Sequence, residues 1–312
     1  MANLLREDAS GVYIIAATPF KSNGTIDYNS VDSLLEFYLD KGVTGITILG
    51  MMGEANKMSI EEAKEFMGYA VKRISGRVPI VVGISDPGIS NLANLAKSSM
   101  DVGCSGVMIA PPNGLKTEEN IYKYFTTVFE SLGDGVPVCY QDYPQSTDVF
   151  ISVDCFNRLV RHFDQLVMFK HEDCPGLSKL SQIRSAAETD DTLRRVSILV
   201  GNGGLYLPEE LSRGADGAMT GFSFPEMVVE VVKLFAAGSV EVAKDIFDAY
   251  MPLVRYEQQP GFGLAVRKEI LRRRGAIKNA ETRTPGPSLT NIDHEELSAL
   301  LSRLQDRLET MG

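Results

Sequence analysis

Short apolar runs recur along this chain at nearly regular intervals, and this repetition restricts its fold more than any other feature. The runs begin near Val12, Gly45, Pro79, Gly106, Val136, Leu166, Ser197 and Asp216. Most intervals span roughly thirty residues, which is the length of one strand, a loop, a helix and a return loop. Eight successive units of this kind predict an α/β fold, a closed (β/α)8 or TIM barrel, rather than an open sheet.

The sequence within these units supports a parallel sheet covered by helices. Residues 80–82 and 106–109 are uninterrupted apolar segments, as expected for strands that are buried on both faces. Residues 31–39 place apolar side chains along one stripe at helical spacing. A doubly wound open sheet is the alternative. Such a sheet usually has a glycine-rich segment after its first strand, whereas here that strand leads into Thr18-Pro19-Phe20.

The alternation of strands and helices stops after residue 224. Helices are predicted at about 225–237, 239–257, 261–274 and 293–309. We therefore expect a barrel over residues 1–224 and a helical extension over residues 225–312 that packs on it within the same structural unit. The extension is the natural place for a contact between subunits.

The composition excludes several classes of protein. A formal net charge of −10 and a pI near 5.0 repel the phosphates of nucleic acids and anionic membrane surfaces. The 4 cysteines have neither CxxC nor metal-ligand spacing, so we expect reduced thiols and no metal site. Residues 1–10 lack the apolar core of a signal peptide, and no apolar stretch has the length of a membrane span. We therefore expect a cytoplasmic protein.

The strongest candidate for chemistry is Lys170. The active site of such a barrel lies at the carboxyl ends of its strands, and Lys170 directly follows the apolar run 166–169. Burial disfavours the charged form of a lysine side chain, and a neutral amine attacks a ketone to form an imine. The alternative is a structural ion pair with Glu172, Asp173 or Asp142, and the sequence leaves both interpretations open.

Other patterns carry competing hypotheses. Residues 201–204 and Thr220 fall where many barrels bind phosphate through backbone N–H groups, although glycines also serve tight turns there. Four carboxylates could bind a divalent cation, namely Glu54, Asp142, Glu172 and Asp173. Because they have no motif spacing, we expect them instead to be exposed to solvent at the rim of the barrel. We interpret His162 and His171 as ordinary helix or loop residues, with catalysis by His171 as the lesser alternative.

Five motifs follow one another in order along the chain. They are Ala17-Thr18-Pro19-Phe20, Asn23-Gly24-Thr25-Ile26-Asp27, Gly50-Met51-Met52-Gly53-Glu54, Phe169-Lys170-His171-Glu172 and Gly214-Ala215-Asp216-Gly217-Ala218-Met219-Thr220. Together they resemble the dihydrodipicolinate synthase and N-acetylneuraminate lyase family of class I Schiff-base lyases. The resemblance extends from Ala17 to nearly the end of the chain and identifies it as an atypical member.

The resemblance implies that Lys170 condenses with the ketone of pyruvate or another 2-oxo acid. The resulting iminium is an electron sink when a carbon–carbon bond breaks, or when a proton leaves before dehydration. In the family, the loop after the second strand holds the 2-oxo carboxylate partly through backbone N–H groups, which any non-proline residue supplies. The expected catalytic residues are Lys170 and Gln141, and the expected substrate-binding residues are Met51, Met52, Asn113, Gly201 and Met219.

The chain departs from the family's pattern at positions that handle protons and substrate. The loop threonines are replaced by Met51 and Met52, whose thioethers cannot relay a proton. The fifth-strand tyrosine is replaced by Gln141, and Tyr140 should point to the opposite face unless the strand bulges. The arginine that grips the synthase's aldehyde substrate is replaced by Ser146. We therefore expect a substrate other than that of the synthase.

The resulting hypothesis is a lyase, an aldolase or a dehydratase, that acts on a 2-oxo acid, sugar-derived acids included. Protons would be handled by Glu172, Asp173, Asp142 or a bound water. The alternatives are a barrel that has lost turnover and binds a 2-oxo acid as a sensor or partner subunit, and a phosphate-binding barrel enzyme. We expect no cofactor. We also expect a homo-oligomer, either a tetramer or a dimer, since family members are commonly tetramers. The substrate itself depends on pocket details that the sequence does not specify.

Overall fold

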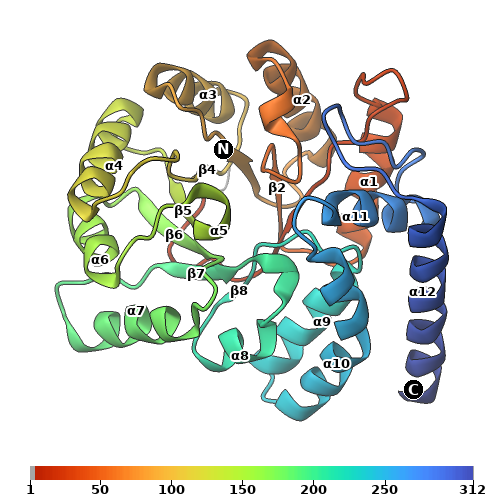
Figure 1. Cartoon of the computed structure of the whole chain (residues 1–312). Helices are drawn as coiled ribbons and strands as arrows, with labels where there is room; N and C mark the ends of the chain where they lie inside the picture. The colour runs from red at the N-terminus through yellow and green to blue at the C-terminus, as the bar shows by residue number, and fades with distance from the viewer. Residues whose placement is uncertain (1–3, 312) are drawn as a thin grey trace.

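The computed structural model describes residues 4–311, which form a closed barrel of parallel strands, β1 to β8, in sequence order (Figure 1). The strands are β1 (Gly11–Ile15), β2 (Gly45–Ile48), β3 (Ile80–Gly83), β4 (Gly106–Ile109), β5 (Val138–Asp142), β6 (Leu166–His171), β7 (Ser197–Val200) and β8 (Gly217–Ala218). The barrel closes where β8 pairs with β1, with Gly217 opposite Gly11. The prediction of a TIM barrel is confirmed.

Helices surround the barrel and continue beyond it. Those between the strands are α1 (Tyr28–Asp40), α2 (Ile60–Ile74), α3 (Ile89–Asp101), α4 (Glu118–Leu132), α5 (Pro144–Thr147), α6 (Val153–His162), α7 (Leu177–Thr189) and α8 (Leu207–Ser212), with the 3-10 helices η1 (Ala55–Lys57) and η2 (Asn202–Gly204). After β8 come α9 (Pro225–Ala236), α10 (Val240–Glu257), α11 (Gly263–Arg273) and α12 (Asn291–Met311). The predicted C-terminal helices are thus confirmed. Because α9 packs against β1 and β8, it also covers the barrel. The division into two segments at residue 224 stays a prediction.

The pairing of β5 with β6 decides which side chains face the barrel mouth. Gln141 lies opposite Lys170, and Asp142 lies opposite His171. Side chains alternate between the two faces of a strand. Gln141 and Lys170 therefore face the barrel interior together, while Asp142 and His171 face the surrounding helices.

Tyr140 also faces the helices. Its ring centroid lies 4.7 Å from that of Phe125 and 5.8 Å from that of Phe169. Its hydroxyl is buried and has no hydrogen-bond partner among residues 4–311. The register of β5 is irregular at its start, but this does not turn Tyr140 inward. The prediction that Tyr140 points away from the barrel interior is confirmed.

A buried ion pair ties α11 to the loop after β2. Lys268 Nζ lies 2.5 Å from Glu54 Oε1, and the two side chains are 0% and 1% exposed. Glu54 Oε2 accepts further hydrogen bonds from Lys57 Nζ at 2.8 Å and from the backbone N–H of Arg283 at 2.9 Å. Removing one partner from such a buried set leaves a costly unpaired charge, so these contacts fix α11 over the barrel mouth. Glu54 is therefore engaged in structural contacts rather than exposed at a solvated rim.

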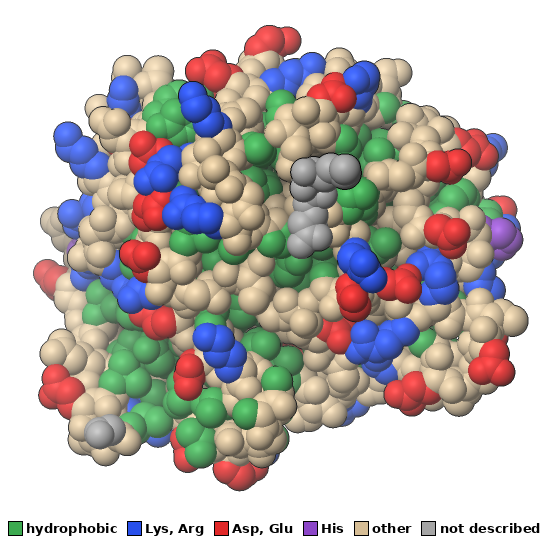
Figure 2. All heavy atoms as spheres, turned by 180° about the vertical axis from the view of Figure 1, so that it is seen from behind, with side chains coloured by type: hydrophobic (Ala, Val, Ile, Leu, Met, Phe, Trp, Pro, Cys, Tyr) green, Lys and Arg blue, Asp and Glu red, His purple; other side chains and the backbone are tan. Residues whose placement is uncertain are grey.

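The outer surface carries both signs of charge. On the face shown in Figure 2, basic and acidic side chains are interspersed, and apolar side chains lie between them. Within residues 4–311, every helix is too short or too polar to span a membrane.

Candidate active site

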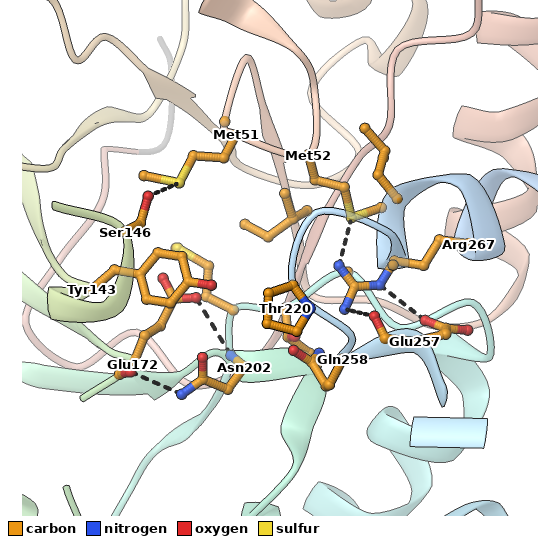
Figure 3. A pocket seen from close by; sticks show the side chains of 18 of the residues that line it. Met51, Met52, Tyr143, Ser146, Glu172, Asn202, Thr220, Glu257, Gln258 and Arg267 are labelled. Atoms are coloured by element: carbon orange, nitrogen blue, oxygen red, sulfur yellow. Dashed lines mark hydrogen bonds and ion pairs between the residues drawn. The ribbon is translucent and has the colours of Figure 1, made fainter. Parts of the chain in front are cut away.

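A cavity of about 370 Å³ opens at the carboxyl ends of the strands (Figure 3). Residues at or after the ends of β1, β2, β5, β6, β7 and β8 line it, and the segment from Glu257 to Arg267 closes one side. This is the end of the barrel where the sequence places the candidate functional residues.

Lys170 lies in this cavity and is paired with one carboxylate. The residue is 5% exposed, and its Nζ is 2.7 Å from Glu172 Oε1. Asp142 and Asp173 instead contact Lys179 Nζ, at 2.9 and 2.6 Å. Of the ion pairs that the sequence left open, the structure therefore contains the one with Glu172. Lys170 nevertheless belongs to the residues that line the cavity.

Glu172 is held in place by neighbouring strands. Gln141 Nε2 donates a hydrogen bond to Glu172 Oε1 at 2.7 Å. Asn202 donates from its side-chain amide to the backbone oxygen of Glu172 at 2.9 Å, and its backbone N–H lies 3.4 Å from Oε2. A Cβ on Gly201 would lie 2.3 Å from Glu172 Cγ, so only glycine leaves room for the carboxylate at that position. Several contacts thus direct one carboxylate oxygen at Lys170.

The residues predicted from the sequence occupy different places. Met51, Met52, Gln141, Lys170 and Met219 line the cavity. Met51 is 45% exposed at the cavity mouth, where Ser146 Oγ lies 3.5 Å from its sulfur. Gly201 lies behind Glu172 instead of in the lining, and Asn113 is exposed in the segment after β4, outside the cavity. The functional roles assigned to these residues stay predictions.

Tyr143 is a cavity residue that the sequence interpretation missed. It directly precedes Pro144, which begins α5, and its ring lies beside Glu172 in the cavity wall (Figure 3). Burial raises the pKa of the Tyr143 phenol, and the charge of Glu172 raises it further. Tyr143 follows Gln141 by two residues, so strand alternation extended past the end of β5 would have indicated the same face.

Arg267 is the second cavity residue that the sequence interpretation missed. Its Nε lies 3.0 Å from Oε2 of Glu257, a residue that is 1% exposed. Burial raises the pKa of Glu257 to about 7, although Arg267 lowers it. No local sequence motif marks this pair, because α10 and α11 reach the cavity only through their packing over the barrel.

A second group of titratable residues lies behind β6, on the side away from the cavity. His171 Nδ1 is 4.0 Å from Asp142 Oδ2, and His171 Nε2 is 3.9 Å from Glu210 Oε1. Burial lowers the pKa of His171 to about 4, and it raises the pKa of Asp142 to about 7 and that of Glu210 to about 8. His171 does not line the cavity, which supports its interpretation as a structural residue.

The fold and the site together define a TIM-barrel protein with a lysine–carboxylate pair in a cavity at the carboxyl ends of its strands. The model of the dihydrodipicolinate synthetase family matches residues 8–304. The chain belongs to this family, so the membership predicted from the motifs is confirmed.

Relatives of known name and structure resemble between about three quarters and nearly all of the chain. The 4-hydroxy-tetrahydrodipicolinate synthase of Aquifex aeolicus is 28% identical over 240 residues, which cover 76% of this chain and 78% of the relative. The L-2-keto-3-deoxyarabonate dehydratase of Azospirillum brasilense is 26% identical over 299 residues, or 94% of each chain. The crystal structure of dihydrodipicolinate synthase from Rhodopseudomonas palustris has a TM-score of 0.94 and 46% identity, covering 96% of this chain and 99% of that one.

Replacing Glu210 with glutamine should flatten the pH dependence of stability. The pKa of Glu210 is about 8 in the folded protein, above its usual 4.5, so the folded state keeps a proton that the unfolded chain has lost. As the pH rises from about 5 to 8, this one proton should therefore make the unfolding free energy of the wild type fall by about 1.4 kcal/mol per pH unit. Glu210→Gln removes that slope.

Urea unfolding at several pH values across this window measures the effect. The exposed residue Glu130 on α4 provides the control, because it is not among the charges that raise the pKa of Glu210, and Glu130→Gln should keep the wild-type slope. Equal slopes in the wild type and Glu210→Gln would show that the buried carboxyl group does not hold the extra proton.

Proposed function

We propose that this protein is a lyase that forms a Schiff base between Lys170 and the ketone of a 2-oxo acid. The observation that carries the proposal is the position of the amine, 2.7 Å from a single carboxylate and open to a cavity of about 370 Å³. Synthase and dehydratase relatives within the family support it.

Glu172 has the position needed to prepare Lys170 for attack. An ammonium group has no lone pair, so it must lose a proton before its nitrogen can attack. In the proposed first step, the Lys170 ammonium transfers a proton to Glu172 Oε1, and the free amine adds to C2 of the substrate. Loss of the C2 oxygen as water, which takes up the protons released from nitrogen and carboxyl, then leaves the iminium.

The iminium accepts the electron pair of the next bond to break. That bond is either C3–H, which leads to dehydration of a hydroxylated substrate, or C3–C4, which leads to aldol cleavage. Glu172 is the proposed proton acceptor for this step, and Tyr143 is the second proton-bearing group nearby (Figure 3). Gln141 cannot titrate, and its hydrogen bond to Glu172 suits it to positioning the carboxylate.

The proposed substrates are pyruvate-type 2-oxo acids other than that of the synthase. Met51, Met52 and Ser146 line the cavity where the family's pattern has hydroxyl groups and an arginine. The full-length match to a 2-keto-3-deoxy sugar acid dehydratase supports testing hydroxylated 2-oxo acids first. We also propose a cytoplasmic homo-oligomer, a tetramer or a dimer, that needs no cofactor.

A catalytically impaired barrel that only binds a 2-oxo acid is the second candidate. The 2.7 Å ion pair is equally compatible with this candidate, because an ammonium that keeps its proton is not a nucleophile. A phosphate-binding site is less well supported. Gln258 Nε2 occupies the space beside Gly203, where a Cβ would lie only 1.7 Å away, and this restricts access to the loop.

Borohydride reduction in the presence of pyruvate tests the Schiff base directly. Reduction should convert the imine into a stable secondary amine, and peptide mass analysis should locate one added carboxyethyl group on Lys170. Lys170→Arg is the control, because it keeps a positive charge beside Glu172 but cannot form the adduct. A wild-type chain that remains unmodified with every 2-oxo acid tried would refute the proposed chemistry.

Exchange of the C3 protons of pyruvate in deuterated water tests the role of Glu172. Glu172→Gln should still be trapped by borohydride, but more slowly because Lys170 loses its proton acceptor, and exchange should slow by about 10²- to 10⁴-fold, the usual contribution of a general base. Tyr143→Phe, measured in parallel, separates the two proton-bearing groups. Unchanged exchange in Glu172→Gln would exclude Glu172 as the proton acceptor.

A further inference from the structure

The guanidinium of Arg267 is fixed at the cavity wall with one edge occupied and one edge open. Its Nε lies 3.0 Å from Glu257 Oε2, and its Nη2 lies 3.3 Å from the backbone oxygen of Glu257. These contacts occupy the Nε–Nη2 edge. On the other side, Nη1 contacts only the sulfur of Met52, at 3.8 Å, among the residues that the structure describes (Figure 3).

The open edge is suited to a carboxylate. A guanidinium binds a carboxylate through two parallel N–H···O hydrogen bonds, and the Nη1–Nη2 edge has this geometry. A thioether is a weak hydrogen-bond acceptor, so Met52 does not satisfy Nη1. Arg267 therefore has donors available toward the cavity that it lines.

Arg267 is held in this orientation before any ligand binds. Ser223 Oγ donates a hydrogen bond to the other carboxylate oxygen of Glu257, which fixes the partner of Arg267. A Cβ on Gly203 would lie 3.3 Å from Arg267 Nη2, so the loop after β7 packs against the guanidinium. The next residue, Lys268, is anchored to Glu54. A group that is positioned in advance loses little entropy when it binds a ligand.

The charges of the cavity residues also indicate that Arg267 is available for an anionic ligand. Among the lining residues within 4–311, Lys170 and Arg267 are the basic side chains. Lys170 is paired with Glu172 and is consumed as a donor when it forms an imine. The side chains of Met51 and Met52 supply no donor in the neighbouring loop. Arg267 is thus the remaining cationic group for an anionic substrate.

We propose that Arg267 binds a carboxylate of the substrate and thereby selects acids over neutral ketones. The inference rests on the proposed function, because it assumes that the ketone of the same molecule reaches Lys170. Two carboxylates have the chemistry to bind the open edge of Arg267. One is the carboxylate beside the ketone, and the other is a second carboxylate at the far end of a diacid.

Trapping at increasing ligand concentration tests the role of Arg267. Wild type and Arg267→Gln are reduced with borohydride in the presence of pyruvate, 2-oxoglutarate or the neutral ketone hydroxyacetone. The variant should need an acid concentration about 10- to 100-fold higher for half-maximal trapping, as expected for a lost charged hydrogen bond. The hydroxyacetone concentration for half-maximal trapping should not change. Arg272 lies on the same helix and pairs with Glu269 outside the cavity, so Arg272→Gln is the matched control.

The outcomes separate this inference from the proposed function. If the half-maximal concentration rises for pyruvate, Arg267 binds the carboxylate beside the ketone. If it rises for 2-oxoglutarate alone, Arg267 binds the distal carboxylate. Unchanged half-maximal concentrations for both acids overturn the inference while trapping itself still supports the function. No trapping in the wild type refutes the function instead.

A conservative variant covers the case in which Arg267→Gln does not fold because the buried Glu257 loses its cationic partner. Arg267→Lys keeps the charge but loses the two-point hydrogen bond, so it should weaken acid binding while the neutral ketone is trapped as in the wild type. Circular dichroism confirms that each variant is folded. Wild-type acid preference in a folded Arg267→Lys variant would overturn the inference.

Discussion

The ion pair between Lys170 and Glu172 is the interaction on which the site depends. Both side chains point into the barrel mouth because they are two residues apart at the end of β6, where alternation places them on the same side. Gln141 and Asn202 fix the carboxylate, and Gly201 leaves room for it. From the sequence alone, a structural ion pair and a nucleophilic amine are competing interpretations of Lys170. In the proposed mechanism they are joined, because the partner of the ammonium also takes its proton.

The C-terminal helices contribute to the site through a second set of buried charges. The ion pair of Lys268 with Glu54 joins α11 to the loop after β2, and the neighbouring Arg267 is thereby held at the cavity wall. A barrel that ended after β8 would lack this cation and its partner Glu257. The C-terminal helices therefore contribute to the site itself, since they supply the side of the cavity opposite Tyr143 and Ser146 (Figure 3).

The features that could be predicted from sequence are those set by periodicity. Repeated apolar runs predicted the barrel, and strand alternation placed Gln141 with Lys170 and turned Tyr140 away. The same rule, carried past β5, would also have found Tyr143. Arg267 was beyond this kind of reasoning, because its position depends on packing between segments more than 200 residues apart, such as the contact of Lys268 with Glu54. The choice of Glu172 over Asp142 or Asp173 as the partner of Lys170 likewise depends on Lys179, a helix residue that binds the other two.

A crystal structure of the protein reduced with borohydride in the presence of pyruvate tests the proposed Schiff base most directly. We expect continuous electron density from Lys170 Nζ to C2 of the former ketone, with Glu172 beside the new bond. A structure in which Lys170 remains unmodified and still paired with Glu172, with the cavity empty or pyruvate bound elsewhere, would contradict it.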